Sequence, residues 1–367
     1  MAEAKVDFNF LGKSGIKVSN ICIGTMTFGK SNMNVPTQAT DDVAYEILDK
    51  YTELGGNFID TADVYGEGSS EKTIGAWLRR TSLLRDDLIL ATKVRFPLSR
   101  GVNNVGLSRR HIVRNIEESL ERLNIYYIDL YQSHLWDNAT PIEETLRTFD
   151  DLVRCGKIRY FGVSNVCGWQ LQKIVDKIEM MGLNRCVTLQ QQYNLLCRQP
   201  EWEEFMVCEN EGIGVLPWSP LKGGMLTGKF QRDVEPDGSG SRVGYVHKDE
   251  SKAMQSAPAF SKYNSDDKYW ELIDLLKSIA EKHGKTIPQV SLRWLIQKPV
   301  VSSVIIGATS VKQLEDNMGA SSGWSLSDEE MTSLDEASST PRLYPYEMIW
   351  RKSNERVNPF NRSNIVN

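Results

Sequence analysis

Short apolar segments alternate with longer amphipathic segments along most of the chain. The apolar segments are rich in β-branched residues and lie at 21–24, 57–60, 88–92, 128–134, 160–164, 188–192, 214–219 and 303–307. Several are too apolar to alternate between an inner and an outer face, which is typical of parallel strands covered on both sides. The pattern therefore predicts eight buried strands.

The segments between these strands carry helix signals. Residues 41–54 begin with two acidic residues and end before a Gly-Gly pair, and residues 141–155 begin with proline and end before Gly156. Residues 108–123 begin at a serine suited to an N-cap and repeat apolar residues at helical spacing. Eight strand–helix units in series predict an α/β fold, a closed (β/α)8 TIM barrel.

Three segments exceed a minimal barrel. Residues 10–18 place two glycines between apolar positions, and we expect an N-terminal hairpin that plugs the bottom of the barrel. Residues 231–267, rich in polar residues and glycine, form a long loop after strand seven, and residues 339–367 form an extended C-terminal tail. We predict one domain over residues 1–367, with its barrel core at 8–320.

Composition narrows the class of protein. The chain has 367 residues, 43 Lys and Arg against 48 Asp and Glu, and a net charge of −5. A hydrophobic fraction of 40% supplies a sizeable core and excludes a disordered chain. The mild acidity argues against nucleic acid or a membrane as partner. No apolar run approaches the roughly 20 residues that span a bilayer, and the first ten residues lack a signal pattern, so we expect a cytoplasmic protein.

Other fold and site classes lack their motifs. The six cysteines include no C-x-x-C pair and the four histidines no H-E-x-x-H, so neither a disulfide framework nor a metal site is predicted. A doubly wound dinucleotide-binding sheet usually carries G-x-G-x-x-G directly after its first strand. The nearest match, at residues 238–244, lies in a polar stretch without a strand, and no tyrosine is followed four residues later by lysine. These absences favour the barrel.

Polar side chains follow the predicted strands, at the end where barrels carry active sites. Asp60 ends the second strand, and Tyr65 follows in the loop; Lys93 follows the third strand and His134 ends the fourth. A phenol has a pKa of about 10, which a neighbouring ammonium lowers, and a carboxylate keeps that ammonium charged. We predict general acid–base catalysis at a carbonyl or alcohol, with His134 orienting the substrate oxygen.

Seven motifs, in order along the chain, resemble those of the aldo-keto reductase family. They are FIDTADVYGEGSSE at 58–71, ATK at 91–93, YQSH at 131–134, VSN at 163–165, QQQYN at 190–194, PWSPL at 217–221 and GATSVKQ at 307–313. The resemblance spans about residues 8–320. Residues 109–111 and 216–227 are most similar to fungal members, which include aryl-alcohol dehydrogenases and polyketide-pathway enzymes such as versiconal acetate reductases.

The resemblance implies an NADPH-dependent oxidoreductase that reduces an aldehyde or ketone. It implies that Asp60, Tyr65, Lys93 and His134 are catalytic, with Tyr65 as general acid. The implied cofactor-binding residues are Gly24, Thr25, Met26, Asp60, Ser164, Asn165, Gln190, Trp218, Ser219, Leu221, Gly223, Lys229, Gly307, Thr309, Gln313, Asp316 and Asn317. Of these, Trp218 would stack on the nicotinamide, and Lys229 would lie beside the pyrophosphate. Residues 308–310 carry no cation for a 2′-phosphate, but NADPH remains the predicted cofactor.

The substrate side leaves alternatives open. Tyr65, His134 and Trp136 are expected to contact the substrate, although Trp136 fits a packed helix-cap aromatic equally well. Aromatic residues of the tail (Tyr344, Tyr346, Trp350) are a candidate lid, so an aromatic aldehyde or ketone is the expected substrate. Two alternatives remain: a nicotinamide-binding regulatory protein similar to potassium-channel β-subunits, and an alcohol dehydrogenase working in the oxidative direction. The sequence does not distinguish a monomer from a homo-oligomer.

Overall fold

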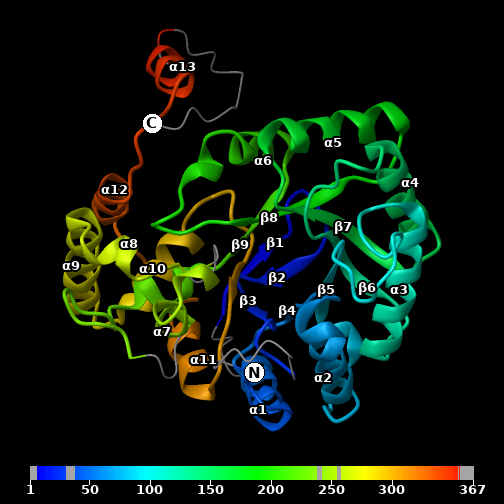
Figure 1. Ribbon diagram of the computed structural model, residues 1–367, viewed down its shortest axis with the longest axis horizontal. Helices are drawn as coiled ribbons and strands as arrows, with labels where there is room; N and C mark the ends of the chain where they lie inside the picture. The colour runs from blue at the N-terminus through cyan, green and yellow to red at the C-terminus, as the bar shows by residue number, and fades with distance from the viewer. Residues whose placement is uncertain (1–5, 30–37, 238–241, 254–257, 354, 356–367) are drawn as a thin grey trace.

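The computed structural model describes residues 6–29, 38–237, 242–253, 258–353 and 355. Its centre is an eight-stranded parallel sheet surrounded by helices, in the strand order β10-β3-β4-β5-β6-β7-β8-β9 (Figure 1). The strands are β3 (Ile21–Gly24), β4 (Phe58–Asp60), β5 (Ile89–Val94), β6 (Ile128–Ser133), β7 (Ile158–Ser164), β8 (Cys186–Gln192), β9 (Gly214–Trp218) and β10 (Val304–Ile306). The eight predicted strands and the α/β TIM-barrel class are confirmed.

The two edges of the sheet meet between β9 and the segment that leads into β10. Val215 forms a parallel bridge with Val301. The amide of Val215 donates to the carbonyl of Val300, and the amide of Ser302 donates to the carbonyl of Val215, both at 2.9 Å. These contacts join the two edges at one point, so the sheet is nearly closed into a barrel.

Helices cover the outside of the sheet. In chain order they are α1 (Asp41–Glu53), η1 (Tyr65–Gly68), α2 (Ser69–Leu78), η2 (Arg85–Asp87), α3 (Arg109–Leu123), α4 (Ile142–Arg154), α5 (Gly168–Met181), η3 (Gln199–Glu201), α6 (Glu204–Glu211), η4 (Lys222–Thr227), α7 (Arg242–His247), η5 (Glu250–Lys252), α8 (Ser261–Asn264), α9 (Asp267–His283), α10 (Ile287–Ile296), α11 (Val311–Met318), α12 (Asp328–Ala337) and α13 (Tyr346–Ser353). Their buried faces and the outer strand residues form the larger of two apolar clusters.

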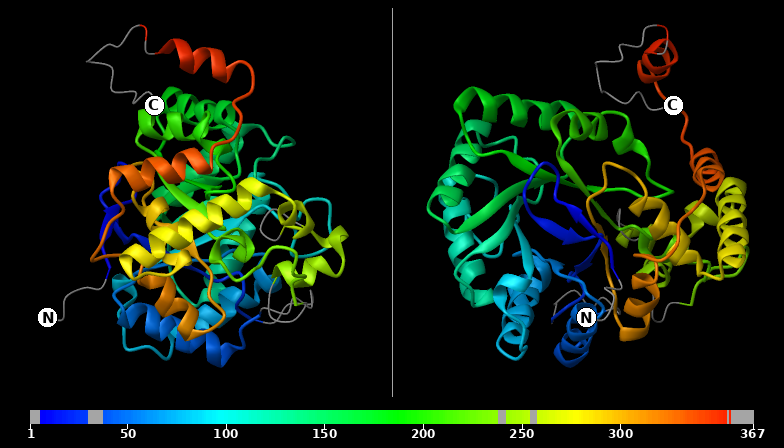
Figure 2. Two further views of the ribbon diagram at one scale, coloured as in Figure 1. Left: turned by 90° about the vertical axis from the view of Figure 1, so that its left-hand side faces the viewer. Right: turned by 180° about the vertical axis from the view of Figure 1, so that it is seen from behind.

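The second apolar cluster fills the barrel interior. It combines strand residues such as Cys22, Phe58 and Leu216 with Leu11 and Val18 of the N-terminal hairpin. The hairpin strands, β1 (Phe8–Phe10) and β2 (Lys17–Ser19), pair antiparallel and lie across one end of the barrel (Figure 2, right). Because the hairpin side chains pack against the interior of the strands, that end is sealed, and the open end carries the site.

The alternation of strand side chains places polar groups above this inner cluster. Successive residues of a strand point to opposite faces, so residues two apart share a face. On this inner face, Asp60 comes two residues after Phe58, Lys93 two after Ala91, and Gln132 two after Leu130. The inner face therefore changes from apolar to polar toward the carboxyl end of each strand.

The two predicted irregular segments contain more helix than expected. The described parts of residues 231–267 include α7, η5 and α8, and residues 238–241 and 254–257 lie outside the described residues. The predicted tail contains α13, which stands apart from the barrel in Figures 1 and 2. Tyr346 packs on Trp202 and donates a 2.8 Å hydrogen bond to Glu203, whereas Tyr344 is exposed. Residues 354 and 356–367 of the tail lie outside the described residues.

Among the described residues, no helix combines the length and the apolar character that a membrane crossing requires.

The Tyr51 hydroxyl joins the first two barrel strands to the hairpin. It lies 2.8–2.9 Å from Ser19 Oγ and from the carbonyl oxygens of Ile21 and Phe58. It also accepts a hydrogen bond from the backbone amide of Phe58 at 3.1 Å. We expect Tyr51→Phe to lower the free energy of unfolding by about 1–3 kcal/mol, because buried polar groups lose their partner. Urea denaturation measures the change. Tyr126→Phe, at an exposed tyrosine, is the control; an equal loss there would contradict the assignment.

Candidate active site

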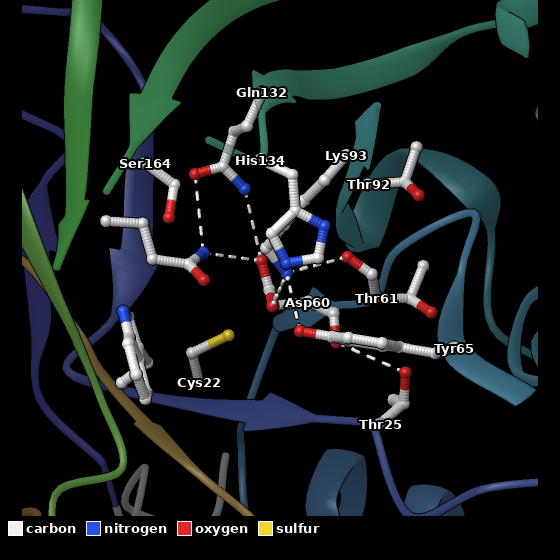
Figure 3. A network of polar contacts seen from close by, with 12 residues as sticks. Cys22, Thr25, Asp60, Thr61, Tyr65, Thr92, Lys93, Gln132, His134 and Ser164 are labelled. Atoms are coloured by element: carbon white, nitrogen blue, oxygen red, sulfur yellow. Dashed lines mark hydrogen bonds and ion pairs between the residues drawn. The ribbon is translucent and has the colours of Figure 1, made fainter. Parts of the chain in front are cut away.

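The four predicted catalytic residues meet at the open end of the barrel. Asp60 ends β4, Lys93 lies in β5, and His134 follows β6, while Tyr65 begins η1 in the loop after β4. Figure 3 shows these side chains pointing toward one another across the strand ends. Parallel strands bring their carboxyl ends to one rim, so residues far apart in sequence become neighbours here.

A buried ion pair forms the base of the site. Lys93 Nζ lies 2.5 Å from Asp60 Oδ2, and the two side chains are 0% and 2% exposed. Lys93 Nζ also donates to the Thr61 carbonyl at 2.8 Å. The other carboxylate oxygen, Asp60 Oδ1, accepts the side-chain amides of Gln132 at 3.1 Å and Gln190 at 2.8 Å. These hydrogen bonds satisfy both buried charges, which would otherwise be costly.

Tyr65 lies directly above this pair. Its hydroxyl accepts a hydrogen bond from Lys93 Nζ at 3.3 Å, and the ammonium is 4.9 Å from the phenol ring centre. The His134 ring meets the Tyr65 ring edge-on at 5.8 Å. A hydroxyl, an ammonium and an imidazole are thus grouped around one small volume.

The loop that carries Tyr65 is fixed from behind by Glu71. This fully buried carboxylate accepts hydrogen bonds of 2.6 Å from Thr92 Oγ1 in β5 and from Arg122 Nε in α3. Gly68 has a φ of +88°, and a Cβ there would lie 2.9 Å from Arg122 Cδ. Glycine at position 68 avoids both the backbone strain and this contact, so the FIDTADVYGEGSSE motif carries information on the loop geometry as well as the tyrosine.

The pKa of Tyr65 differs from the expectation drawn from the sequence. Burial raises it most, and Asp60 adds to the rise; Lys93 and Arg242 lower it, but the net pKa is above the usual value of about 10. Burial lowers the pKa of Lys93, yet Asp60 and Tyr65 outweigh burial and raise it. Tyr65 is therefore a protonated phenol beside a permanently charged lysine, not a phenol with a lowered pKa.

His134 is held in its neutral form. Burial is the main cause that lowers its pKa well below the usual range, and the charges of Lys93 and Arg95 lower it further. Its Nδ1 atom is buried and has no hydrogen-bond partner among the described residues. Phe96 packs edge-on against the ring at 4.9 Å. A neutral imidazole has one N–H donor, which suits a carbonyl oxygen.

Asn165 links the ends of three strands. Its Nδ2 donates to the His134 carbonyl and to Ser164 Oγ, both at 2.9 Å, and its Oδ1 accepts Trp218 Nε1 at 3.2 Å. Both amide atoms therefore have protein partners, a structural role that the sequence did not predict. The amide nitrogen of Gln190 is likewise used by Asp60, which leaves its oxygen to accept from a ligand.

The turn after β9 has the geometry of an anion cradle. Ser219, Lys222, Gly223 and Gly224 all have a positive φ. The amides of Lys222 and Gly224 donate to the carbonyls of Ser219 and Leu221 within the turn, and turns of this kind can present their remaining N–H groups to an anion. A Cβ on Gly224 would lie 2.6 Å from Lys229 Nζ, so the glycine admits the ammonium. Lys229 forms no ion pair among the described residues. Half-buried Leu221 packs beside this turn against the outer apolar cluster. These features fit a phosphate group.

The predicted adenosine residues lie just before α11 and within it. Gly307 is exposed, and a Cβ there would meet nothing within 4 Å. Ser310 caps the helix, and the Thr309 amide and hydroxyl both donate to Gln313 Oε1 at 2.9 Å. Asp316 instead accepts from Thr286 and Gln289 at the start of α10, and Asn317 is buried. Asp316 thus holds two helices together.

The remaining predicted residues lie around the rim. Gly24 ends β3, and Thr25 Oγ1 donates to the Asp60 carbonyl at 3.2 Å, while Met26 is exposed. Trp136 is half-buried and packs edge-on against Trp169 at 5.8 Å.

Sequence reasoning missed Gln132, Arg95 and Arg242. Gln132 precedes His134 by two residues, so strand alternation could have placed it on the inner face. Arg95 follows Val94, the last residue of β5, and Arg242 begins α7 in the excursion after β9. Both arginines influence the site electrostatically, Arg95 through His134 and Arg242 through Tyr65.

Comparison with known proteins supports one family. The model of the Aldo/keto reductase family matches residues 20–339. The chain is 34% identical to Aldo-keto reductase dtxS3 of Metarhizium robertsii over 92% of both chains. It is 34% identical to a probable voltage-gated potassium channel subunit beta of Arabidopsis thaliana, over 86% of this chain and 91% of the relative. It is 30% identical to versiconal hemiacetal acetate reductase of Aspergillus parasiticus, over 93% of this chain and 100% of the relative.

The buried ion pair predicts a large stability effect. Asp60→Asn leaves Lys93 as an uncompensated buried charge, and we expect the free energy of unfolding to fall by about 3–5 kcal/mol. Asp151→Asn makes the same change in a half-exposed pair with Arg109 and should cost at most about 1 kcal/mol. Chemical denaturation of both variants measures the two losses in free energy of unfolding. Similar losses would show that burial does not increase the contribution of the Lys93–Asp60 pair to stability.

Proposed function

The chain belongs to the aldo/keto reductase family, as its motifs predicted, and on that basis we propose that it reduces an aldehyde or ketone to the alcohol with NADPH. Members of this family act on small-molecule carbonyl compounds. The observation that carries the proposal is the hydrogen bond from Lys93 Nζ to the Tyr65 hydroxyl, above a buried Asp60 and beside a neutral His134.

The proposed proton transfer follows from this geometry. A bound NADPH would supply a hydride to the carbonyl carbon. Tyr65 donates its proton to the carbonyl oxygen, and the ammonium of Lys93 stabilises the phenolate that remains. Asp60 keeps Lys93 charged and in place, and the neutral imidazole of His134 holds the oxygen by an N–H hydrogen bond. In the reverse direction the same groups would take a proton from an alcohol.

The residues present fit a nicotinamide dinucleotide. The glycine turn of η4 with Lys229 suits the pyrophosphate, and the capped start of α11 with Gly307 suits the adenosine half. Trp218 is half-buried beside Asn165 and suits stacking on the nicotinamide. We propose the same cofactor residues that the motifs implied: Gly24, Thr25, Met26, Asp60, Ser164, Asn165, Gln190, Trp218, Ser219, Leu221, Gly223, Lys229, Gly307, Thr309, Gln313, Asp316 and Asn317.

We further propose an aromatic carbonyl substrate. Phe96 packs on His134, and Trp136 packs on Trp169 near the same rim. Flat rings offer a substrate ring both contact area and preferred orientations. The potassium-channel relative supports a second candidate function, nicotinamide-dependent regulation of another protein.

Tyr65→Phe tests the reaction. We expect this variant to lose turnover of aromatic aldehydes by at least about a hundredfold, because the general acid is removed, while NADPH binding is retained. Loss of NADPH absorbance measures turnover across an aldehyde panel, with NADH in parallel, and fluorescence titration measures binding. Tyr126→Phe, at an exposed tyrosine, is the control. Background rates for the unmodified protein across the panel would favour the regulatory function, and a fully active Tyr65→Phe would falsify the mechanism.

The raised pKa of Tyr65 predicts the pH dependence of reduction. The phenol stays protonated below its pKa, so turnover at saturating NADPH should be flat from about pH 6 to 9 and fall only above about pH 10. Lys93→Met removes a cation that lowers this pKa, so the alkaline decline should move to still higher pH. Initial rates against pH measure both, and a decline centred near neutrality would assign the acid to another group.

A further inference from the structure

Two arginines near the site carry positive charge in addition to the paired Lys93. Asp60 compensates Lys93, but Arg95 and Arg242 also act on the reacting groups, and neither forms an ion pair with a carboxylate among the described residues. A half-buried guanidinium without a counter-ion next to a catalytic centre is unusual, because charges removed from water are normally paired.

The ring of Phe96 lies between Arg95 and His134 and contacts both. Its guanidinium carbon lies 5.2 Å from the centre of the Phe96 ring, whose edge-on neighbour at 4.9 Å is the His134 ring. Its Nε is buried and has no hydrogen-bond partner in the part of the chain that the structure describes. The Phe96 ring thus holds the arginine at the rim through a cation–π contact.

Asp137 is a carboxylate near Arg95, but the two form no ion pair within the described residues. The charge of Arg95 acts on Asp137, but the carboxylate of Asp137 already accepts hydrogen bonds from the amides of Leu107 and Ala139 and from Thr140 Oγ1 at 2.7–3.0 Å. Asp137 therefore remains a charged carboxylate that joins the loop after β6 to the loop after β5. Its hydrogen bonds do not involve Arg95, so the N–H groups of Arg95 are left for another acceptor.

We propose that Arg95 binds an anionic group of the substrate, so that the preferred substrates are aromatic aldehydes or ketones that also carry a carboxylate. This inference rests on the proposed carbonyl reduction and names its substrate class. The guanidinium fork matches a carboxylate with two parallel hydrogen bonds. Arg95 and His134 then hold the two ends of one molecule, the anion at the rim and the carbonyl oxygen at Tyr65. Arg242 adds positive potential from the opposite segment.

Substituted benzaldehydes test the anchor directly. The probes are 3- and 4-formylbenzoate, their methyl esters, which lack the charge at nearly the same shape, and benzaldehyde. We expect the unmodified protein to favour at least one formylbenzoate over its ester by about tenfold or more in kcat/KM. Arg95→Gln should reduce that preference to about twofold or less, with benzaldehyde turnover by the same variant as the reference for any general effect on the site. Arg95→Lys, which keeps the charge without the fork, should restore the preference in part.

Arg100→Gln is the matched control, because it removes the same charge from an exposed arginine in the same loop. It should keep the preference. Turnover without a carboxylate preference, or a preference that survives in Arg95→Gln, would overturn the anchor while the proposed reaction stands. If no aldehyde is turned over, the proposed reaction fails. Calorimetric binding of the formylbenzoates then decides the anchor: at least tenfold weaker binding to Arg95→Gln supports it, and equal binding overturns it.

Discussion

The ion pair between Lys93 and Asp60 is the interaction on which the rest of the site depends. Each charge lies inside the barrel, out of contact with water, and persists because its partner is 2.5 Å away. Asp60 also accepts amides from Gln132 and Gln190, so one carboxylate connects β4, β5, β6 and β8. Burial raises the pKa of Tyr65, which stays a phenol, and is the main cause that lowers the pKa of His134, while the charged lysine beneath Tyr65 lowers the pKa of both groups.

The fold and the identity of the central residues could be predicted from the sequence for the same physical reason. Strands covered on both faces are apolar throughout, so the points where they turn polar are conspicuous. Asp60 and Lys93 lie at those points, and their spacing from Phe58 and Ala91 places them on the inner face. Parallel pairing then brings them together. One domain over the whole chain remains a prediction.

Properties that depend on how deeply a side chain is buried, or on the local backbone conformation, could not be predicted from the sequence. The sequence shows that Lys93 accompanies Tyr65, but only the structure shows that burial outweighs the lysine and raises the tyrosine pKa. Asn165 has a positive φ, and its amide contacts the His134 carbonyl and Trp218, and the motif alone specifies neither feature. Arg95 was overlooked because an arginine after a strand usually faces solvent, and its contact with Phe96 depends on how the loop folds.

The pairing of β3 with β10 joins the two ends of the barrel sequence. During synthesis β3 emerges among the first elements, yet β10 emerges only after the other barrel strands. Contacts between segments so distant in sequence are slow to form, since the intervening chain must first be ordered. Gly24 and Gly307, at the ends of these two strands, therefore become neighbours last. A partly synthesised chain lacks one side of the proposed dinucleotide site, so binding of the proposed cofactor would report that the whole barrel has folded.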